Sequence, residues 1–152
     1  MKKLFSFIVL FLLTVFLSTN SITAQGKLGV VGKKYSRTEA NVLFGNVITS
    51  VKVSREELKA ALANVKDYLL FKIRGNQALL LNERKAVLNS SSTAALSPNE
   101  VAYAFSKSVV EDFLAFSTAN TFEVEQRNDV LSVSDNFTTL ELSTPCPPMC
   151  PF

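Results

Sequence analysis

Cys146 and Cys150 are the most reactive side chains in this sequence, and four of its five prolines lie beside them. A polyproline segment rises about 3.1 Å per residue, so four steps span roughly 12 Å, whereas a disulfide requires Cα atoms within about 7 Å. A bonded pair therefore requires a turn, which a cis peptide bond before Pro147 or Pro148 could provide. We expect an intramolecular Cys146–Cys150 disulfide, with a disulfide between two chains as the alternative.

The spacing C-x-x-x-C-P over residues 146–151 also resembles the copper-binding motif of the Sco family of copper chaperones. The resemblance implies Cys146, Met149 and Cys150 as Cu(I) ligands, since thiolates and thioethers suit this soft ion. Sco proteins place the motif early in a thioredoxin-like domain and add a downstream His, and this chain has no His. Thiol-redox or copper chemistry is the alternative to a structural disulfide.

Carboxylate pairs are the other groups that could do chemistry. Glu111 and Asp112 are adjacent, and Glu123 and Glu125 alternate along a predicted strand. Two such groups flanking a glycosidic bond would make a small hydrolase, which requires a concave pocket containing at least two of them. The alternative interpretation is that they mark the water-facing sides of a helix and a strand whose apolar residues are buried.

The composition excludes several classes of function. Without His the chain has neither a Ser-His-Asp nor a Cys-His nucleophile system. Without Trp, aromatic platforms for a sugar would have to come from Tyr35, Tyr68 or Tyr103, and we expect the last two to be packing residues. Basic residues number 16 against 13 acidic ones, and they form no large cluster. We therefore predict no catalytic residue, no cofactor or metal site, and no nucleic-acid partner.

The N-terminal residues have the pattern of a secretory signal peptide. Lys2 and Lys3 precede a largely apolar run from Leu4 to Leu17, and a polar segment ending at Ala24 follows. A membrane-spanning helix needs roughly 17–25 apolar residues, which is longer than this run. We expect cleavage near Ala24 and export to the bacterial periplasm or the cell exterior. An uncleaved segment in the membrane is the alternative.

Two helices are predicted in the remaining chain. Ser54 and Glu57 have the spacing of a capping box, and Leu58, Ala61, Leu62 and Val65 follow on one face, which predicts a helix at about 55–66. A second box with a proline at the first helical position, over residues 97–100, precedes apolar residues spaced three or four apart. This pattern predicts a helix over 98–117.

Strands are predicted around these helices. Short strands are expected near 28–31, 42–53 and 86–88, and Gly75-Asn76 predicts a hairpin over 69–81. Residues 89–93 are expected to form a loop. Three further strands are expected at 122–126, 130–134 and 137–142, and the sheet is expected to end near Ser143 because proline cannot donate to a strand ladder.

These elements predict an α+β fold, with a mostly antiparallel meander sheet and two helices packed on one face. We expect a signal peptide over 1–24, a single domain over 25–143 and a Pro/Cys-rich tail over 144–152. The expected function is that of an exported binding or structural protein without enzymatic activity, whose partner is another protein or a cell surface.

Overall fold

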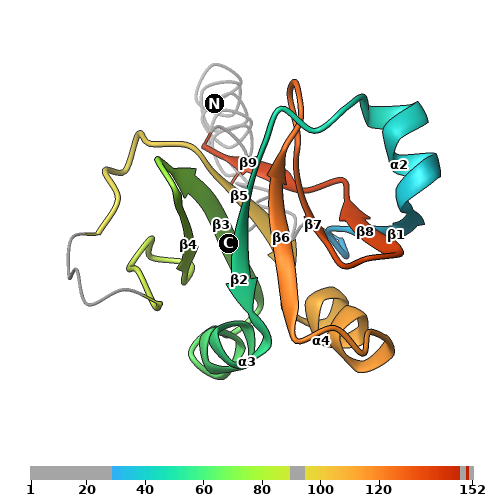
Figure 1. Cartoon of the computed structure of the whole chain (residues 1–152). Coiled ribbons are helices and arrows are strands. Elements are labelled where there is room, and N and C mark those ends of the chain that lie inside the picture. The colour runs from blue at the N-terminus through green and yellow to red at the C-terminus, as the bar shows by residue number, and fades with distance from the viewer. Residues whose placement is uncertain (1–28, 90–94, 148–149, 151–152) are drawn as a thin grey trace, which may run out of the picture.

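The computed structural model describes residues 29–89, 95–147 and 150. Within these ranges there are three helices and nine strands, and the strands form two antiparallel sheets (Figure 1). This arrangement confirms the predicted α+β class. None of the helices in this part of the chain is long and apolar enough to cross a membrane. The predicted signal segment and most of the predicted loop at 89–93 lie outside the described residues.

The first sheet has five strands in the order β1-β8-β7-β6-β2. These strands are β1 (Lys33–Ser36), β8 (Thr138–Glu141), β7 (Leu131–Ser134), β6 (Thr121–Gln126) and β2 (Thr49–Ser54). Strands β6, β7 and β8 form the predicted C-terminal meander, with their ends within one residue of the expected positions.

The second sheet has four strands in the order β4-β3-β5-β9. These strands are β4 (Gln77–Leu81), β3 (Tyr68–Arg74), β5 (Ala102–Ser106) and β9 (Thr144–Cys146). Strands β3 and β4 form the predicted hairpin, and Gly75 in its turn has a φ of 57°. The strand predicted at 86–88 is reduced to one bridge, between Leu81 and Val87.

The prediction that the sheet ends near Ser143 is wrong. Thr144–Cys146 pairs with β5, and Pro145 lies opposite Tyr103. Because β9 is an edge strand, it needs to donate hydrogen bonds to one neighbour only, which makes a proline tolerable there. The first residues of the predicted tail therefore belong to the folded domain.

The three helices are α2 (Arg37–Phe44), α3 (Arg55–Ala63) and α4 (Lys107–Phe116), and each begins directly after a strand that ends in serine. The predicted box at Ser54 is present: its hydroxyl accepts from the Glu57 N–H, and the Glu57 carboxylate accepts from the Ser54 N–H. Helix α3 is thus confirmed, although it ends three residues before the predicted position.

The helix predicted over 98–117 is wrong in its first half. Ser97 and Glu100 form a turn, in which the Glu100 N–H donates to the Ser97 carbonyl. The Glu100 carboxylate, instead of capping a helix, accepts hydrogen bonds from Arg74 across the sheet surface. Residues Ala102–Ser106 pair with both β3 and β9 as strand β5, so the helix begins only at Lys107.

The N-terminal strand predictions are also wrong in position. No strand covers the described part of 28–31, since the first one is β1. Residues Val42–Phe44 form the last turn of α2 instead of starting a strand, and Gly45 follows with a φ of 83°. Only the second half of the predicted strand at 42–53 is extended, as β2.

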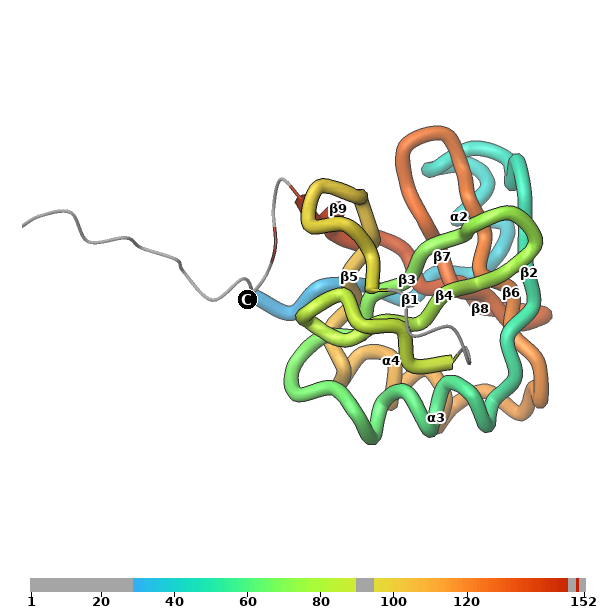
Figure 2. Tube along the Cα trace, turned by 90° about the vertical axis from the view of Figure 1, so that its left-hand side faces the viewer, coloured from blue at the N-terminus to red at the C-terminus, as the bar shows by residue number. Residues whose placement is uncertain are grey.

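The main core lies between the two sheets and is closed at one end by α3 and α4, which lie side by side (Figures 1 and 2). Helix α2 lies apart from them, beside β1 and β8 of the five-stranded sheet (Figure 1). A second apolar cluster, which includes Val31, Leu96 and Cys146, covers the other face of the four-stranded sheet. Both faces of the four-stranded sheet are therefore covered by apolar side chains.

Candidate functional site

The two cysteines form the predicted disulfide. The Cα atoms of Cys146 and Cys150 are 4.6 Å apart, and the Cys146–Pro147 peptide bond is cis. Cys146 is fully buried in the second apolar cluster, whereas Cys150 is exposed. Neither sulfur is a thiolate in this state, so copper binding would require prior reduction, and Met149 lies outside the described residues.

The carboxylates singled out from the sequence do not gather in one pocket, although Glu123 and Glu125 both lie against the Arg37 guanidinium, at 3.4 and 2.5 Å. Glu111 and Asp112 are exposed on α4, and Asp112 forms an ion pair with Lys34 at 2.5 Å. Glu123 is partly exposed, but Glu125 is fully buried, so the water-facing position predicted for this pair is wrong for Glu125. None of the three pockets described below contains two of these four groups.

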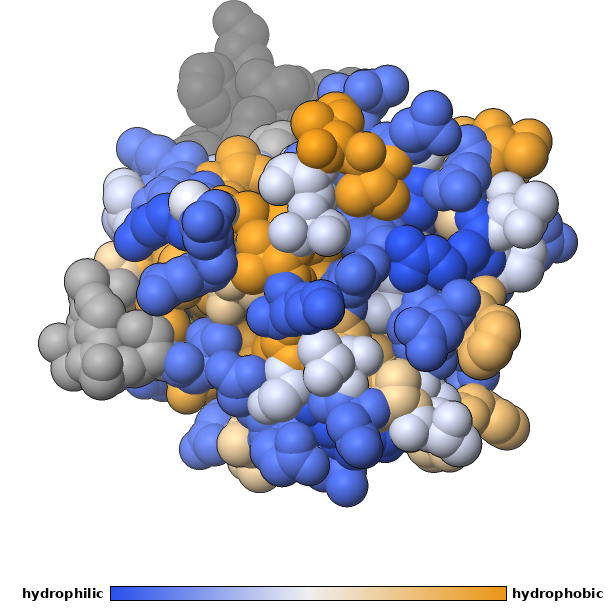
Figure 3. All heavy atoms as spheres, in the orientation of Figure 1, coloured by the Kyte–Doolittle hydropathy of each residue, from blue (hydrophilic) through white to orange (hydrophobic). Residues whose placement is uncertain are grey.

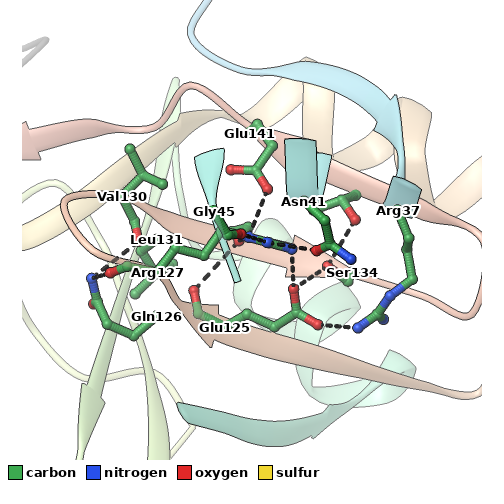
Figure 4. Close-up of polar contacts among 12 residues, drawn as sticks. Arg37, Asn41, Gly45, Glu125, Gln126, Arg127, Val130, Leu131, Ser134 and Glu141 are labelled. Atoms are coloured by element: carbon green, nitrogen blue, oxygen red, sulfur yellow. Dashed lines mark hydrogen bonds and ion pairs between the residues drawn. The ribbon is translucent and has the colours of Figure 1, made fainter. Parts of the chain in front are cut away.

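Glu125 instead belongs to a buried polar network on the outer face of the five-stranded sheet (Figure 4). The strand register places side chains from three neighbouring strands on this face. They are Glu125 on β6, Ser132 and Ser134 on β7, and Thr139 and Glu141 on β8, all of them fully buried. Arg37 and Asn41 of α2 reach the network from the helix (Figure 4).

Arg127 is the centre of this network and is itself fully buried. Its guanidinium donates to Glu125 Oε2 at 3.0 Å, to Ser132 Oγ at 3.1 Å and to Asn41 Oδ1 at 2.8 Å. It also donates to the carbonyl oxygen of Gly45, directly after α2. A single arginine thus joins β6 and β7 to the C-terminal end of α2.

Arg37, the first residue of α2, joins the other end of that helix to the sheet. Its guanidinium lies 2.5 Å from Glu125 Oε1 and donates to the Asp135 carbonyl at 2.8 Å. Ser134 donates to the second oxygen of Glu125 at 2.9 Å. Glu125 therefore accepts from two arginines and a serine, which compensates the cost of burying its charge.

Glu141 is the least compensated member of the network. Its Oε1 lies 3.2 Å from Arg127 Nε, but the Nε–H is directed at Ser132, and within the described residues neither Glu141 oxygen accepts a hydrogen bond. Burial raises the pKa of Glu141 to about 7, against the opposing effect of Arg127. Glu125, Arg127 and Glu141 at the centre of the network are closed to solvent, so they present no surface to a substrate.

The helical end of the molecule carries an open groove of about 550 Å³ between α3 and α4. Leu62 and Leu114, each about 5% exposed, form its apolar floor, and Ala63 and Ala115 are exposed beside them. This volume lies within the range of about 300–1,000 Å³ that is typical of ligand-binding pockets.

The charges along the groove are mainly positive. Arg55, Lys59 and Lys107 line it together with one acidic residue, Glu111. Arg55 donates to three backbone carbonyls, and Lys107 donates to the Val65 carbonyl at 3.2 Å. In the part of the chain that the structure describes, the Lys59 ammonium group has no hydrogen-bond or ion-pair partner, so it is available to an incoming anion.

A second pocket, of about 360 Å³, lies among β1, the start of α2, the end of α4 and the turn between β7 and β8. Phe116 and Phe137, which line it, are 75% and 79% exposed. Its charged groups are already engaged: Glu39 caps α2, and the Asp135 carboxylate accepts from two backbone N–H groups. This pocket offers aromatic surface but no free charge.

In the view of Figure 3, hydrophobic residues are visible between hydrophilic ones over β2, β3 and β4, whereas hydrophilic residues dominate on the side of β6.

A third pocket, of about 330 Å³, lies between the edges of β2 and β4 and has mainly polar walls. Asn89 fills part of the β4 edge, since its side chain bonds the Leu80 N–H and the Ala78 carbonyl. Some of the backbone hydrogen-bonding groups at the β4 edge are therefore already bound within the chain.

The three tyrosines do not form a platform. Tyr68 is buried in the second apolar cluster and Tyr103 packs against the main core, as predicted. Tyr35 lines the aromatic pocket, with its ring 5.4 Å from that of Phe44.

Neither the buried network nor the groove is evident from the sequence. The capping box at Ser36 and Glu39, which begins α2, has the same S-x-x-E spacing as the box at Ser54 and is the local signal for this helix. No local pattern indicates that Glu125 and Arg127 lie against Glu141, or that α3 packs beside α4, because the residues in each contact are distant in the chain.

Comparison of this chain with protein-family models, with curated proteins and with solved structures finds no significant match. Over residues 29–89, 95–147 and 150, no group of three or more His, Cys, Asp or Glu side chains is arranged to hold a metal ion.

Proposed function

We propose that this protein is an exported binding domain without enzymatic activity, which holds a partner macromolecule in the groove between α3 and α4. One observation carries the proposal: this groove combines an apolar floor with Lys59, a cation that has no partner among the described residues. Binding surfaces typically pair an apolar centre with a polar rim. The other two pockets lack this combination, because one has mainly polar walls and the other has charges that are already engaged.

Export is supported by two independent features. Lys2 and Lys3, the apolar run and the polar segment ending at Ala24 have the order of a signal peptide. The Cys146–Cys150 disulfide suits an oxidising compartment such as the periplasm or the cell exterior. The intact mass of the protein from its native host tests this part of the proposal, since loss of residues 1–24 is expected and the full-length mass would contradict it.

Site-specific crosslinking tests the binding function. A photo-crosslinking amino acid is placed at Ala63 or Ala115 in the groove, or at the exposed Arg84 in the connection between β4 and β5 as a control. We expect one defined adduct from the groove positions in the native host, identified by mass spectrometry, and none from position 84. Absence of any groove adduct, or equal adducts from all positions, would contradict the proposal.

A thiol-redox function is the second candidate, favoured by the exposure of Cys150 beside a buried Cys146. A variant with Cys146→Ala and Cys150→Ser distinguishes the two functions. A binding domain retains its groove adduct in this variant, whereas a redox protein loses its activity. For the copper alternative, the reduced protein is titrated with Cu(I), and stoichiometric binding that the double variant abolishes would favour it.

A further inference from the structure

We infer that the segment bound in the α3/α4 groove is an acidic amphipathic helix of a partner protein. This inference rests on the proposed function and names the class of partner for the same site. It is carried by the length of the groove, by the composition of its floor and by the sign of its charges.

The groove between the two helices is long enough to bind a third helix. Helix α3 has nine residues and α4 has ten, which correspond to lengths of about 14 and 15 Å at 1.5 Å per residue. The apolar anchors of a helix bound in a groove follow the positions i, i+3 or i+4, and i+7, which cover about 10.5 Å. The groove is therefore long enough for two helical turns, and it leaves the outer face of the bound helix in water.

The floor suits helical side chains. Leu62 and Leu114 close the bottom of the groove between the helices. Ala63 and Ala115 present only methyl groups at exposed positions, so the bound backbone can approach more closely than it could over larger residues. Apolar anchors of the partner would contact the two leucines, and its small or polar residues would pass the two alanines.

The charges select an acidic partner. Three cations, Arg55, Lys59 and Lys107, line the groove with one anion, Glu111, which lies 3.9 Å from Lys107 on the same helix, so the groove has a formal charge of +2 (3 − 1). Carboxylates that flank the apolar stripe of the partner would pair with Lys59 first, because Arg55 already donates to backbone carbonyls and Lys107 lies near the Glu111 carboxylate. A basic helix of the same pattern would be repelled, since complementary charge determines specificity and association rate.

The groove is also preformed. The capping box at Ser54 and Glu57 fixes the start of α3, and Arg55 and Lys107 tie each helix to the end of the other. Binding therefore requires little ordering of the protein itself, which lowers the entropic cost of association.

Peptide fluorescence tests the inference directly, because this chain contains no Trp and a Trp in the probe is the sole source of the signal. The probes are three peptides of equal length and apolar content. The first has Leu and one Trp at helical spacing with Glu elsewhere, the second replaces every Glu by Lys, and the third has the acidic composition in an order without helical period. We expect a blue shift and saturable binding for the first peptide only.

Two variants with the same change in charge distinguish the effect of a charge in the groove from the effect of the protein's net charge. Lys59→Glu is expected to weaken binding of the acidic peptide by about fivefold or more, because it replaces an attraction with a repulsion. Arg84→Glu, at an exposed position outside the groove, is expected to change the dissociation constant by less than about twofold. Circular dichroism of both variants controls for folding.

Several outcomes would overturn the inference. They are equal or tighter binding of the basic or the aperiodic peptide, no binding of the acidic peptide at millimolar concentration, and equal effects of the two variants. Displacement of the acidic peptide by dodecanoate would assign the groove to a small amphiphile. A dimer dissociated by Ala115→Arg would assign it to a second copy of the chain. A groove adduct in the native host together with failure of the peptide would leave the binding function and reject the acidic helix.

Discussion

Arg55 and Lys107 are the first residues of α3 and α4, and the side chain of each donates to backbone carbonyls at the C-terminal end of the other helix. Arg55 donates to the carbonyls of Leu114, Ser117 and Ala119 at 2.6–2.8 Å, and Lys107 donates to that of Val65 at 3.2 Å. The two helices consequently run antiparallel, and a cation at each end satisfies carbonyls that a helix terminus leaves free. This reciprocal contact holds the walls of the groove together.

Replacing Arg55 by Met should destabilise the protein by about 2–4 kcal/mol, because three carbonyl oxygens lose a charged donor. Lys107→Met removes one long hydrogen bond and should cost about 1 kcal/mol. Urea denaturation followed by circular dichroism measures both. Arg84→Met is the control and should stay within about 0.5 kcal/mol of the wild type. Equal effects of the first two variants would contradict the dominant role of Arg55.

Arg127→Met should lower the free energy of unfolding by about 3–5 kcal/mol in total, because it leaves Glu125 and Glu141 buried without their shared cation. The loss should be smaller at pH 5 than at pH 8, since Glu141, whose pKa burial raises to about 7, is protonated and uncharged at the lower pH. Thermal unfolding at the two pH values measures this difference. A loss that does not depend on pH would indicate that packing of the arginine, and not its charge, is what matters.

Glu141 should make stability depend on pH near neutrality. Its pKa is about 7 in the folded protein against an ordinary value of 4.5, so the folded state holds the proton more tightly. Stability should therefore fall as the pH rises from about 4.5 through 7, by up to about 3 kcal/mol, and then level off. Glu141→Gln should remove this slope and be more stable than the wild type at pH 8, as measured by urea denaturation across the range.

Other carboxylates oppose this trend at lower pH. Hydrogen bonds from Ser54 lower the pKa of Glu57, and those from Ser36 lower that of Glu39. Their contributions are present above the ordinary value of 4.5 and are lost as the pH falls through the lowered values. Maximum stability is therefore expected between about pH 4.5 and 6, and it should move to higher pH in Glu141→Gln. A maximum above pH 8 in the wild type would refute the assignment to Glu141.

Removal of the disulfide should cost about 2 kcal/mol without loss of the fold, because the closed loop spans only four residues of separation. Cys146→Ala combined with Cys150→Ser is the appropriate variant, since position 146 is buried and apolar. Hydrogen exchange should increase at β9 and its partner β5 and remain unchanged in α3 and α4. Global unfolding of the double variant would show that the bridge supports the whole domain.

Local signals located the elements whose stabilising contacts are close in the chain. The Ser54 and Glu57 box predicted the start of α3, and Gly75-Asn76 predicted the β3–β4 turn, because each involves contacts within a few residues. The C-terminal meander was predicted for the same reason, since its strands alternate polar and apolar residues and are joined by short turns.

The same kind of signal failed at residues 97–106. Ser97, Pro98 and Glu100 have the order of a helix start, but Glu100 is bound by Arg74 and the following residues pair with β3 and β9. Apolar residues spaced four apart, such as Val101 and Phe105, also fall on one face of a strand, so the pattern fits both structures. Pairing on both sides, which depends on residues 68–71 and 144–146, decides between them.

Local patterns in the chain predict the class of the fold, the positions of α3 and of five strands, and the Cys146–Cys150 disulfide. All of these depend on short-range hydrogen bonds, on alternation or on loop length. The buried network of Glu125, Arg127 and Glu141 and the cationic groove between α3 and α4 are formed instead by the packing of the folded chain. Those contacts join residues more distant in the chain, and their energies depend on burial, which no local pattern of residues specifies.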